Sequence, residues 1–134
     1  MSSTPKVLDS YSLIAYLEDE KGADKVGELI KQANDLETIL MLSLVNWGEL
    51  YYVVYRTAGK EAAQKALDSL DTLPIQIIPP DREVTKIAGE LKATRKMSYA
   101  DCFAAALAKQ KKADLVTGDK EFRQVENVVK IVWI

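Results

Sequence analysis

The fold is decided by residues 38–55, TILMLSLVNWGELYYVVY, where an apolar run leads directly into a helical pattern. Thr38–Leu42 is too apolar for a sheet with one face open to water, so we predict a strand buried on both faces. Ser43 follows this run and can cap the next helix. A doubly buried strand that leads into a helix is typical of a parallel sheet covered by helices.

The same alternation of short β-rich runs and longer helical patterns continues on both sides of this stretch. Pro79 and Pro80 end one apolar run, and Asp81 can cap the helix that follows. Ser98–Asp101 has the spacing of a capping box at the start of an alanine-rich helix. We predict strands at Lys6–Asp9, Thr38–Leu42, Pro74–Ile78, Leu115–Thr117 and Val128–Trp133, and further helices at about Leu13–Leu17, Ala23–Asn34, Lys60–Leu70 and Arg82–Lys92. The fold class is α/β, a three-layer α/β/α sandwich with a mostly parallel five-stranded sheet.

Length and composition indicate one globular domain. The chain has 134 residues, of which 48% are hydrophobic, and this suffices for a core without disulfides or structural metal. We therefore expect a single domain over residues 1–134. The opening residues lack a basic segment followed by an apolar stretch, and no apolar run approaches the ~20 residues of a membrane helix. We expect a cytoplasmic protein with no membrane partner.

The absence of histidine excludes several enzyme mechanisms. The sequence contains no histidine, so serine and cysteine nucleophiles with an imidazole base, and ribonucleases with two catalytic histidines, are excluded. The net charge of −2 also argues against a protein that coats nucleic acid through a general basic field. If the chain is a hydrolase, carboxylates must carry the reaction.

Two aspartates follow predicted strands at their carboxyl ends. Asp9 follows the first strand, and Asp119 follows the strand at Leu115–Thr117. Ligands of open α/β sheets bind beyond the carboxyl ends of the strands, so both side chains can face one crevice. Each residue alone can also be explained as a turn residue or a helix cap.

Two further acids lie in predicted helices. Glu49 has the apolar helical neighbours Val45 and Val53, which favours a partly buried carboxylate, although a surface glutamate between two apolar stripes is an equal alternative. Asp101 precedes small alanines that allow its helix to approach the sheet closely. An acid at the third helical position also stabilises the helix start, and the two roles are compatible.

Carboxylates brought close together repel one another unless a cation lies among them. Oxygen ligands suit hard ions such as Mg²⁺ and Mn²⁺. Beside a phosphodiester, such ions activate water and stabilise charge on the attacking and leaving oxygens. A metal site would therefore replace the missing histidine.

Four blocks in this order resemble the signature blocks of the PIN domain family. They are Val7–Leu17 (VLDSYSLIAYL), Asn46–Leu50 (NWGEL), Ser98–Ala106 (SYADCFAAA) and Leu115–Phe122 (LVTGDKEF). The resemblance runs from about Lys6 to the C-terminus, and the chain has the length of the VapC-type toxins of toxin–antitoxin pairs. The sequence is therefore similar to that of a VapC-type toxin ribonuclease.

This resemblance implies a function and a set of site residues. It implies a PIN-like sandwich in which Asp9, Glu49, Asp101 and Asp119 hold Mg²⁺ or Mn²⁺ and carry catalysis, with Ser10 and Thr117 as polar helpers near the metal. It further implies metal-dependent cleavage of RNA, a cognate antitoxin that occupies the active-site groove, and homodimerisation. Tyr11 stands where many relatives carry a small polar residue, so we expect an altered rim of the pocket.

Other functions remain as alternatives. A non-catalytic PIN-like module that binds RNA or a protein is expected if a metal acid is missing or displaced, but all four are present. Transfer through an aspartyl-phosphate at Asp9 is disfavoured, since those phosphatases carry a second acid two residues later. Nucleotide-binding motifs of the forms GxxxxGKS, GxxxxGKT and GxGxxG are absent.

Overall fold

The computed structural model describes residues 3–134 as alternating strands and helices, so the first two residues of the domain predicted at 1–134 lie outside the described residues. Three of the predicted caps, Ser43, Asp81 and Ser98, each accept a backbone N–H from the first turn of a helix. In chain order the elements are β1 (Lys6–Leu8), α1 (Ser10–Leu17), α2 (Ala23–Asn34), β2 (Leu40–Ser43), α3 (Leu44–Ala58), α4 (Lys60–Asp71), β3 (Ile75–Ile78), α5 (Arg82–Thr94), α6 (Tyr99–Lys111), β4 (Asp114–Thr117), the 3₁₀ helix η1 (Lys120–Val125) and β5 (Ile131–Trp133).

The five strands form one sheet in the order β3-β2-β1-β4-β5, and every neighbouring pair is parallel. Val7 pairs with Met41 of β2 on one side and with Leu115 of β4 on the other. The chain moves outward from β1 to β2 and β3, then returns to add β4 on the opposite side of β1. The strand order therefore reverses between β1 and β4, which is where open α/β sheets bind ligands.

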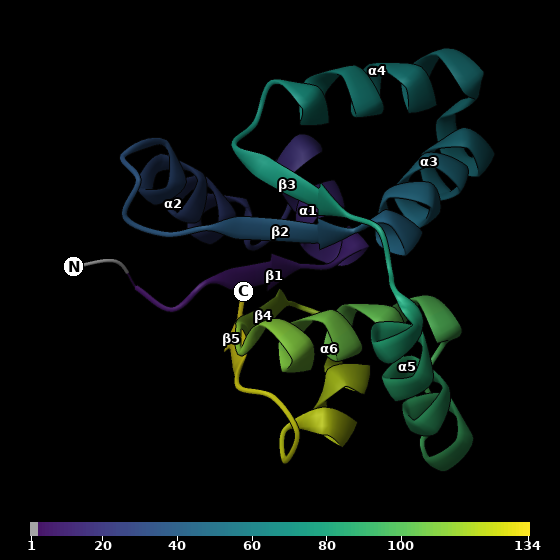
Figure 1. The fold of residues 1–134 in the computed structure, drawn as a ribbon. Helices are drawn as coiled ribbons and strands as arrows, with labels where there is room; N and C mark the ends of the chain where they lie inside the picture. The colour runs from purple at the N-terminus through teal and green to yellow at the C-terminus, as the bar shows by residue number, and fades with distance from the viewer. Residues whose placement is uncertain (1–2) are drawn as a thin grey trace.

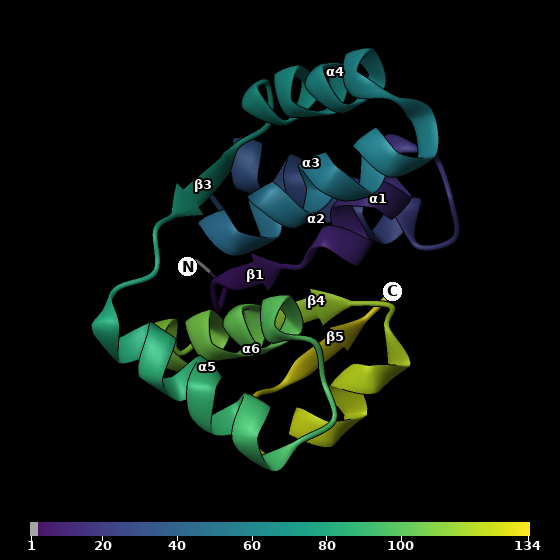
Figure 2. The same ribbon diagram turned by 90° about the vertical axis from the view of Figure 1, so that its right-hand side faces the viewer.

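Helices cover both faces of the sheet, which confirms the predicted α/β/α sandwich. In Figure 2, α1 to α4 lie above β1, and α5 and α6 lie below it. Successive strand residues point to opposite faces: Val7 and Leu115 pack with α5, α6 and η1, whereas Leu8 and Val116 pack with α1 to α4. Figure 1 shows the same two groups of helices on either side of the strands. The three central strands, β1, β2 and β4, are buried on both sides, as predicted for strands so apolar.

Helix α6 packs directly on the three central strands of the sheet. Every residue from Asp101 to Ala108 is buried, and four of these eight residues are alanines. Side chains with only a Cβ let the helix backbone lie near β1, β2 and β4, which it contacts. This close approach brings the first turn of α6, with Asp101, to the carboxyl edge of the sheet.

The structure differs from the predicted elements mainly near the C-terminus. The strand predicted at Val128–Trp133 is confined to Ile131–Trp133, because the backbone N–H groups of Val128 and Val129 donate to the carbonyl of Val125. At the other end of the chain, α1 begins at Ser10 rather than Leu13, because Asp9 caps it. No helix within residues 3–134 is both long and apolar enough to cross a membrane.

Candidate metal centre

The carboxyl edge of the sheet collects acids from four elements. Asp9 directly follows β1, and Asp119 lies two residues after β4, so both flank the point where the strand order reverses. Helix α3 carries Glu49, and the first turn of α6 carries Asp101. The two helices come from opposite faces of the sheet and contact each other across this edge. The fold therefore brings together acids that are far apart in the sequence.

Asp9 is the most buried of these acids, with a relative exposure of 1%. Its Oδ1 accepts the backbone N–H of Ser12 at 2.9 Å, and its Oδ2 accepts the Thr117 hydroxyl at 2.5 Å. Burial raises the pKa of the carboxyl to about 6, these hydrogen bonds oppose the rise, and the charge of Asp119 adds to it. Asp9 thus caps α1 and also presents a carboxylate to the site.

The two predicted polar helpers contact the acids directly. The Ser10 hydroxyl donates to Glu49 Oε1 at 2.5 Å, which links the start of α1 to α3. The buried Thr117 hydroxyl donates to Asp9 and accepts the backbone N–H of Asp119 at 3.0 Å. Each hydroxyl therefore orients at least one of the four acids.

Asp101 lies where the charges of the site converge. The Ser98 hydroxyl accepts the Asp101 backbone N–H at 3.1 Å and caps α6. The pKa of the Asp101 carboxyl is raised to about 7, first by burial and then by the charges of Glu49, Asp119 and Asp9, while Ser98 opposes the rise. The other three predicted acids are therefore close enough to Asp101 for their charges to raise its pKa.

A fifth carboxylate, Glu121, was not predicted from the sequence. Ligand oxygens of Asp101, Asp119 and Glu121 lie within 4.8 Å of one another, a group that does not include Asp9 or Glu49. Asp119 caps η1 by accepting the Glu121 backbone N–H at 2.9 Å. This tight turn brings Glu121 beside Asp119, and an acid two residues after Asp119 was the only sequence signal for it.

These carboxylates fit a hard divalent cation, which prefers oxygen ligands. The described residues around Asp101 supply oxygen ligands, and two of the acids have a raised pKa because charge there is unfavourable. A cation among them would offset both the burial and the mutual repulsion. Asp9, Glu49, Asp101, Asp119 and Glu121 are therefore the residues that could hold Mg²⁺ or Mn²⁺.

One buried amide beside the acids is incompletely paired. The Asn46 side chain is completely buried, and its Oδ1 has no hydrogen-bond partner among the described residues. An unpaired buried polar atom costs ~1–3 kcal/mol, so this asparagine is not explained by stability alone. Its amide nitrogen donates to Glu49, so the unpaired oxygen belongs to a side chain that contacts an acid of the site.

The rim of the site carries an exposed aromatic ring. Tyr11 has a relative exposure of 45%, and its ring lies against the backbone of Gly118, where an added Cβ would overlap it. The residue that departs from the family pattern therefore packs against the glycine that directly precedes Asp119.

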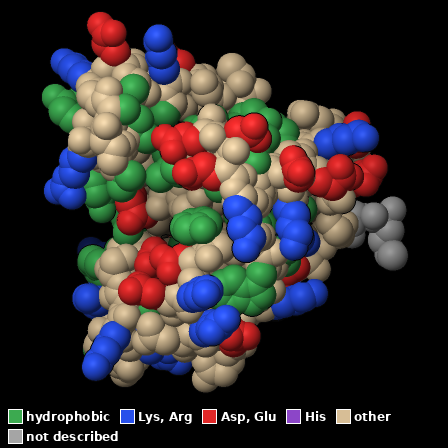
Figure 3. Space-filling model, turned by 180° about the vertical axis from the view of Figure 1, so that it is seen from behind, with side chains coloured by type: hydrophobic (Ala, Val, Ile, Leu, Met, Phe, Trp, Pro, Cys, Tyr) green, Lys and Arg blue, Asp and Glu red, His purple; other side chains and the backbone are tan. Residues whose placement is uncertain are grey.

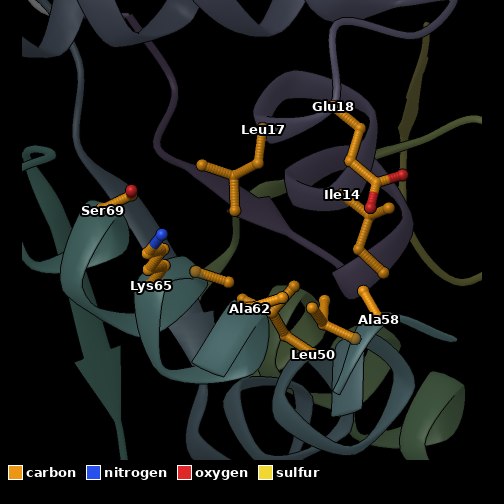
Figure 4. Close-up of a pocket in the computed structure, with 10 residues that line it drawn as sticks. Ile14, Leu17, Glu18, Leu50, Ala58, Ala62, Lys65 and Ser69 are labelled. Carbon is orange, nitrogen blue, oxygen red and sulfur yellow. The ribbon is translucent and has the colours of Figure 1, made fainter. Parts of the chain in front are cut away.

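A separate apolar groove lies between helices α1, α3 and α4. It has a volume of about 230 Å³, and Figure 4 shows Ile14, Leu17, Leu50 and Ala62 around it, with Glu18 and Lys65 among the charged residues. None of the predicted acids lines this groove. Its lining suits apolar side chains rather than a phosphate.

The surface has no single basic face in the view of Figure 3, where acidic and basic side chains are interspersed. Two of the basic side chains near the later acids are already engaged with the backbone. Lys92 Nζ donates to the carbonyl of Met97 at 2.8 Å, and Arg95 Nε donates to the carbonyl of Gln124 at 3.0 Å. This arrangement agrees with the small net charge.

Comparisons with known proteins decide the family. A model of the PIN domain matches residues 6–128, which is nearly the whole chain. The chain belongs to the PIN domain family. The resemblance seen in the four sequence blocks is thereby confirmed. No curated protein sequence matches this PIN domain.

Several solved structures similar to this PIN domain are of toxins or toxin–antitoxin complexes. The VapBC2 structure from Rickettsia felis, bound to promoter DNA, has a TM-score of 0.76 and 24% identity over 96% of this chain and 98% of that one. DNA-bound VapBC from Salmonella typhimurium has a TM-score of 0.74 and 16% identity, with 97% and 98% covered. VapC20 of Mycobacterium tuberculosis, a toxin that cleaves the sarcin–ricin loop, has a TM-score of 0.67 and 18% identity, with 90% and 94% covered. At these identities the likeness shows a shared fold.

Proposed function

We propose that this PIN domain is an endoribonuclease that depends on Mg²⁺ or Mn²⁺ and serves as the toxin of a type II toxin–antitoxin pair. The observation that carries the proposal is the convergence of Asp9, Glu49, Asp101 and Asp119 at the reversal point of the sheet. The fold it shares with VapC20, a toxin that cleaves the sarcin–ricin loop, supports RNA as the substrate.

In this proposal the acids bind the cation and the hydroxyls hold the acids in place. A bound Mg²⁺ or Mn²⁺ supplies an activated water and stabilises charge on the phosphate oxygens. Asp9, Glu49, Asp101 and Asp119 would hold the metal, and Glu121 would join Asp101 and Asp119 as a fifth carboxylate. Thr117 and Ser10 keep Asp9 and Glu49 in fixed orientations through the hydrogen bonds already described. Preorganised ligands of this kind cost no reordering when the cation binds.

We further propose that the protein partner is a cognate antitoxin that occupies the active-site groove. Several proteins of the same fold were solved as toxin–antitoxin complexes, among them VapBC-1 of Haemophilus influenzae. The apolar groove between α1, α3 and α4 would give an antitoxin a second surface for apolar side chains. It is separate from the metal site, because none of the predicted acids lines it. Co-purification with the product of an adjacent upstream gene tests this partner, and failure of that product to bind the chain argues against the toxin assignment.

The remaining parts of the proposal concern assembly and location. We propose a single domain that acts in the cytoplasm as a homodimer. Tyr52 and Tyr55 of α3 are exposed by 45% and 46%, and aromatic rings of this kind are enriched in protein interfaces. The mass of the purified chain, measured by light scattering, tests the dimer.

Cleavage of a mixed RNA pool by the purified chain tests the enzyme. The protein is incubated with Mn²⁺ or Mg²⁺, with chelator in parallel, and the Asp101→Asn variant serves as the matched control. We expect cleavage only with metal, and none by the variant, because the substitution removes a ligand charge but preserves size. Binding of RNA without cleavage, by folded and metal-loaded protein, would instead favour the non-catalytic PIN-like module.

A further inference from the structure

Asn46 connects the two helices that carry acids on opposite faces of the sheet. It lies on α3, three residues before Glu49, and its side chain is completely buried. Its Nδ2 donates to Glu49 Oε1 at 3.3 Å and to the backbone carbonyl of Ala100 at 3.1 Å. Ala100 directly precedes Asp101 in α6. A single amide therefore touches one carboxylate of the site and the backbone beside another.

The Asn46 amide nitrogen is hydrogen-bonded to Glu49, whereas the Asn46 amide oxygen is unpaired among the described residues. Nδ2 donates to two acceptors, and this orientation of the amide leaves Oδ1 without a partner among the described residues. A buried apolar side chain of similar size would avoid this unpaired oxygen. The Ala100 carbonyl belongs to the first turn of α6, so it does not depend on Asn46 for its role in the helix.

Glu49 receives two donors on the same oxygen. Ser10 of α1 donates to Oε1 from one side, and Asn46 of α3 donates to it as well. An isolated glutamate side chain is free to rotate about its bonds, and this freedom is lost when it binds a cation. Two donors that fix Oε1 in advance restrict that rotation before any cation arrives.

We propose that Asn46 is a positioning residue that fixes the Glu49 carboxylate relative to Asp101 and thereby sets the affinity of the site for a divalent cation. The proposal rests on the proposed metal site, but it does not depend on RNA being the substrate. It explains why a buried amide with an unpaired oxygen stands at this position: the site needs the Asn46 donor, and the fold does not.

Titration of the metal-free full-length chain with Mn²⁺, followed by calorimetry, tests this role. The Asn46→Leu variant keeps the approximate volume and removes both donors. We expect its dissociation constant for Mn²⁺ to rise ~10–100-fold, the range typical of residues that orient metal ligands. Its melting temperature without metal should stay the same or rise, because the unpaired oxygen is gone.

Two controls separate positioning from structure. Thr38→Val removes another buried hydroxyl, whose donor bond goes to the Thr4 carbonyl before β1 begins, and should leave the Mn²⁺ affinity unchanged. Ser10→Ala removes the other donor to Glu49 Oε1 and should weaken Mn²⁺ binding in the same direction. If both donors act on that oxygen, the double variant loses less affinity than the product of the single losses.

The outcomes are distinct from those that test the ribonuclease. An unchanged Mn²⁺ affinity in Asn46→Leu overturns the proposal, and so does a weaker affinity that is accompanied by a large drop in the metal-free melting temperature. If Asn46→Leu does not fold, Asn46→Ala removes the amide without added bulk and is judged by the same two measurements. Wild-type protein that binds no Mn²⁺ overturns both this inference and the metal site, whereas Mn²⁺ binding without RNA cleavage overturns only the proposed enzyme.

Discussion

Asp9 and Asp101 are both buried acids of the same site, yet their carboxylates are stabilised in different ways. Asp9 accepts hydrogen bonds from Ser12 and Thr117, which oppose the effect of burial on its pKa. Around Asp101 the charges of other acids add to the effect of burial. After burial, the largest influence on the pKa of Asp9 is thus a hydrogen bond that supports its charge, whereas for Asp101 it is repulsion by another acid, which a cation would offset. This contrast predicts opposite effects of removing the two acids.

The largest effect is expected for Asp101→Asn. RNA cleavage should fall by more than ~100-fold, since even residues that only support metal ligands are worth 10–100-fold. The metal-free protein should become more stable at neutral to alkaline pH, because one of several repelling charges is gone. Initial cleavage rates and calorimetric melting of the metal-free chain measure the two effects.

Asp9→Ala is the matched comparison, and it should lower the stability of the metal-free protein. It removes the N-cap of α1, which is worth ~1 kcal/mol, together with the Thr117 contact. If both variants shift the melting temperature in the same direction, the contrast between the two acids is wrong.

Thr117→Val should have a smaller effect on metal binding. Valine has nearly the same shape but cannot donate to Asp9 or accept the Asp119 backbone N–H. We expect a loss of ~1–3 kcal/mol in the free energy of unfolding and a ~10-fold weaker affinity for Mn²⁺. Urea unfolding and Mn²⁺ titration measure these changes. Thr117→Ser retains the hydroxyl, and a loss as large as that of valine would show that the methyl group, not the hydrogen bonds, matters.

The stability of the metal-free protein should depend on pH in a specific direction. The pKa values of Asp9 and Asp101 rise from 3.8 to about 6 and about 7, so the folded state binds more protons than the unfolded state between these values. The free energy of unfolding therefore falls as pH rises from about 4 to about 7 and levels off above that.

Thermal melting across this pH range, without and with Mn²⁺, measures the dependence. We expect the metal-free melting temperature to fall by at least ~3 °C, the shift produced by roughly 1 kcal/mol in a chain of this size. Mn²⁺ should restore it above about pH 7 but not near pH 5, where protons compete for the acids. In Asp101→Asn the slope should be shallower, and an unaltered slope would exclude Asp101 as a source of the pH dependence.

The smallest effect is expected for Gly118→Ala. The added Cβ would overlap the ring of Tyr11, but that ring is half-exposed and can rotate away into solvent. We therefore expect the free energy of unfolding to change by less than ~1 kcal/mol. Chemical denaturation measures it, with Gly118→Ala combined with Tyr11→Ser as the control. A larger loss, restored in the combined variant, would mean that the Tyr11 ring is held rigidly beside Asp119.

Much of the fold follows from local patterns in the sequence. The apolar run before Ser43 predicted a strand buried on both faces of a parallel sheet, and the cap residues predicted where helices begin. The C-terminal strand was predicted too long because Val128 and Val129 are as apolar as a strand requires. What excluded them was that both backbone N–H groups donate to the Val125 carbonyl in the turn after η1, which hydrophobic periodicity does not indicate.

The site was less accessible to sequence reasoning than the fold. The structure brings the four predicted acids near one another, and their role in metal binding stays a prediction. Glu121 was missed because only the 3₁₀ turn of η1 places it beside Asp119. Asn46 was missed because a buried amide between apolar neighbours has no periodic signature, and its contacts come from the packing of α3 against α6. Both omissions depend on tertiary contacts.

Equilibrium binding of Mn²⁺ to the metal-free chain near neutral pH is the most direct test of the account, because every proposed step needs the cation. Calorimetry of the wild-type protein and of Asp101→Asn should show saturable binding in the first and binding at least ~10-fold weaker in the second. Equal affinity in the two proteins, or no saturable binding in the wild type, would contradict a metal centre at these carboxylates.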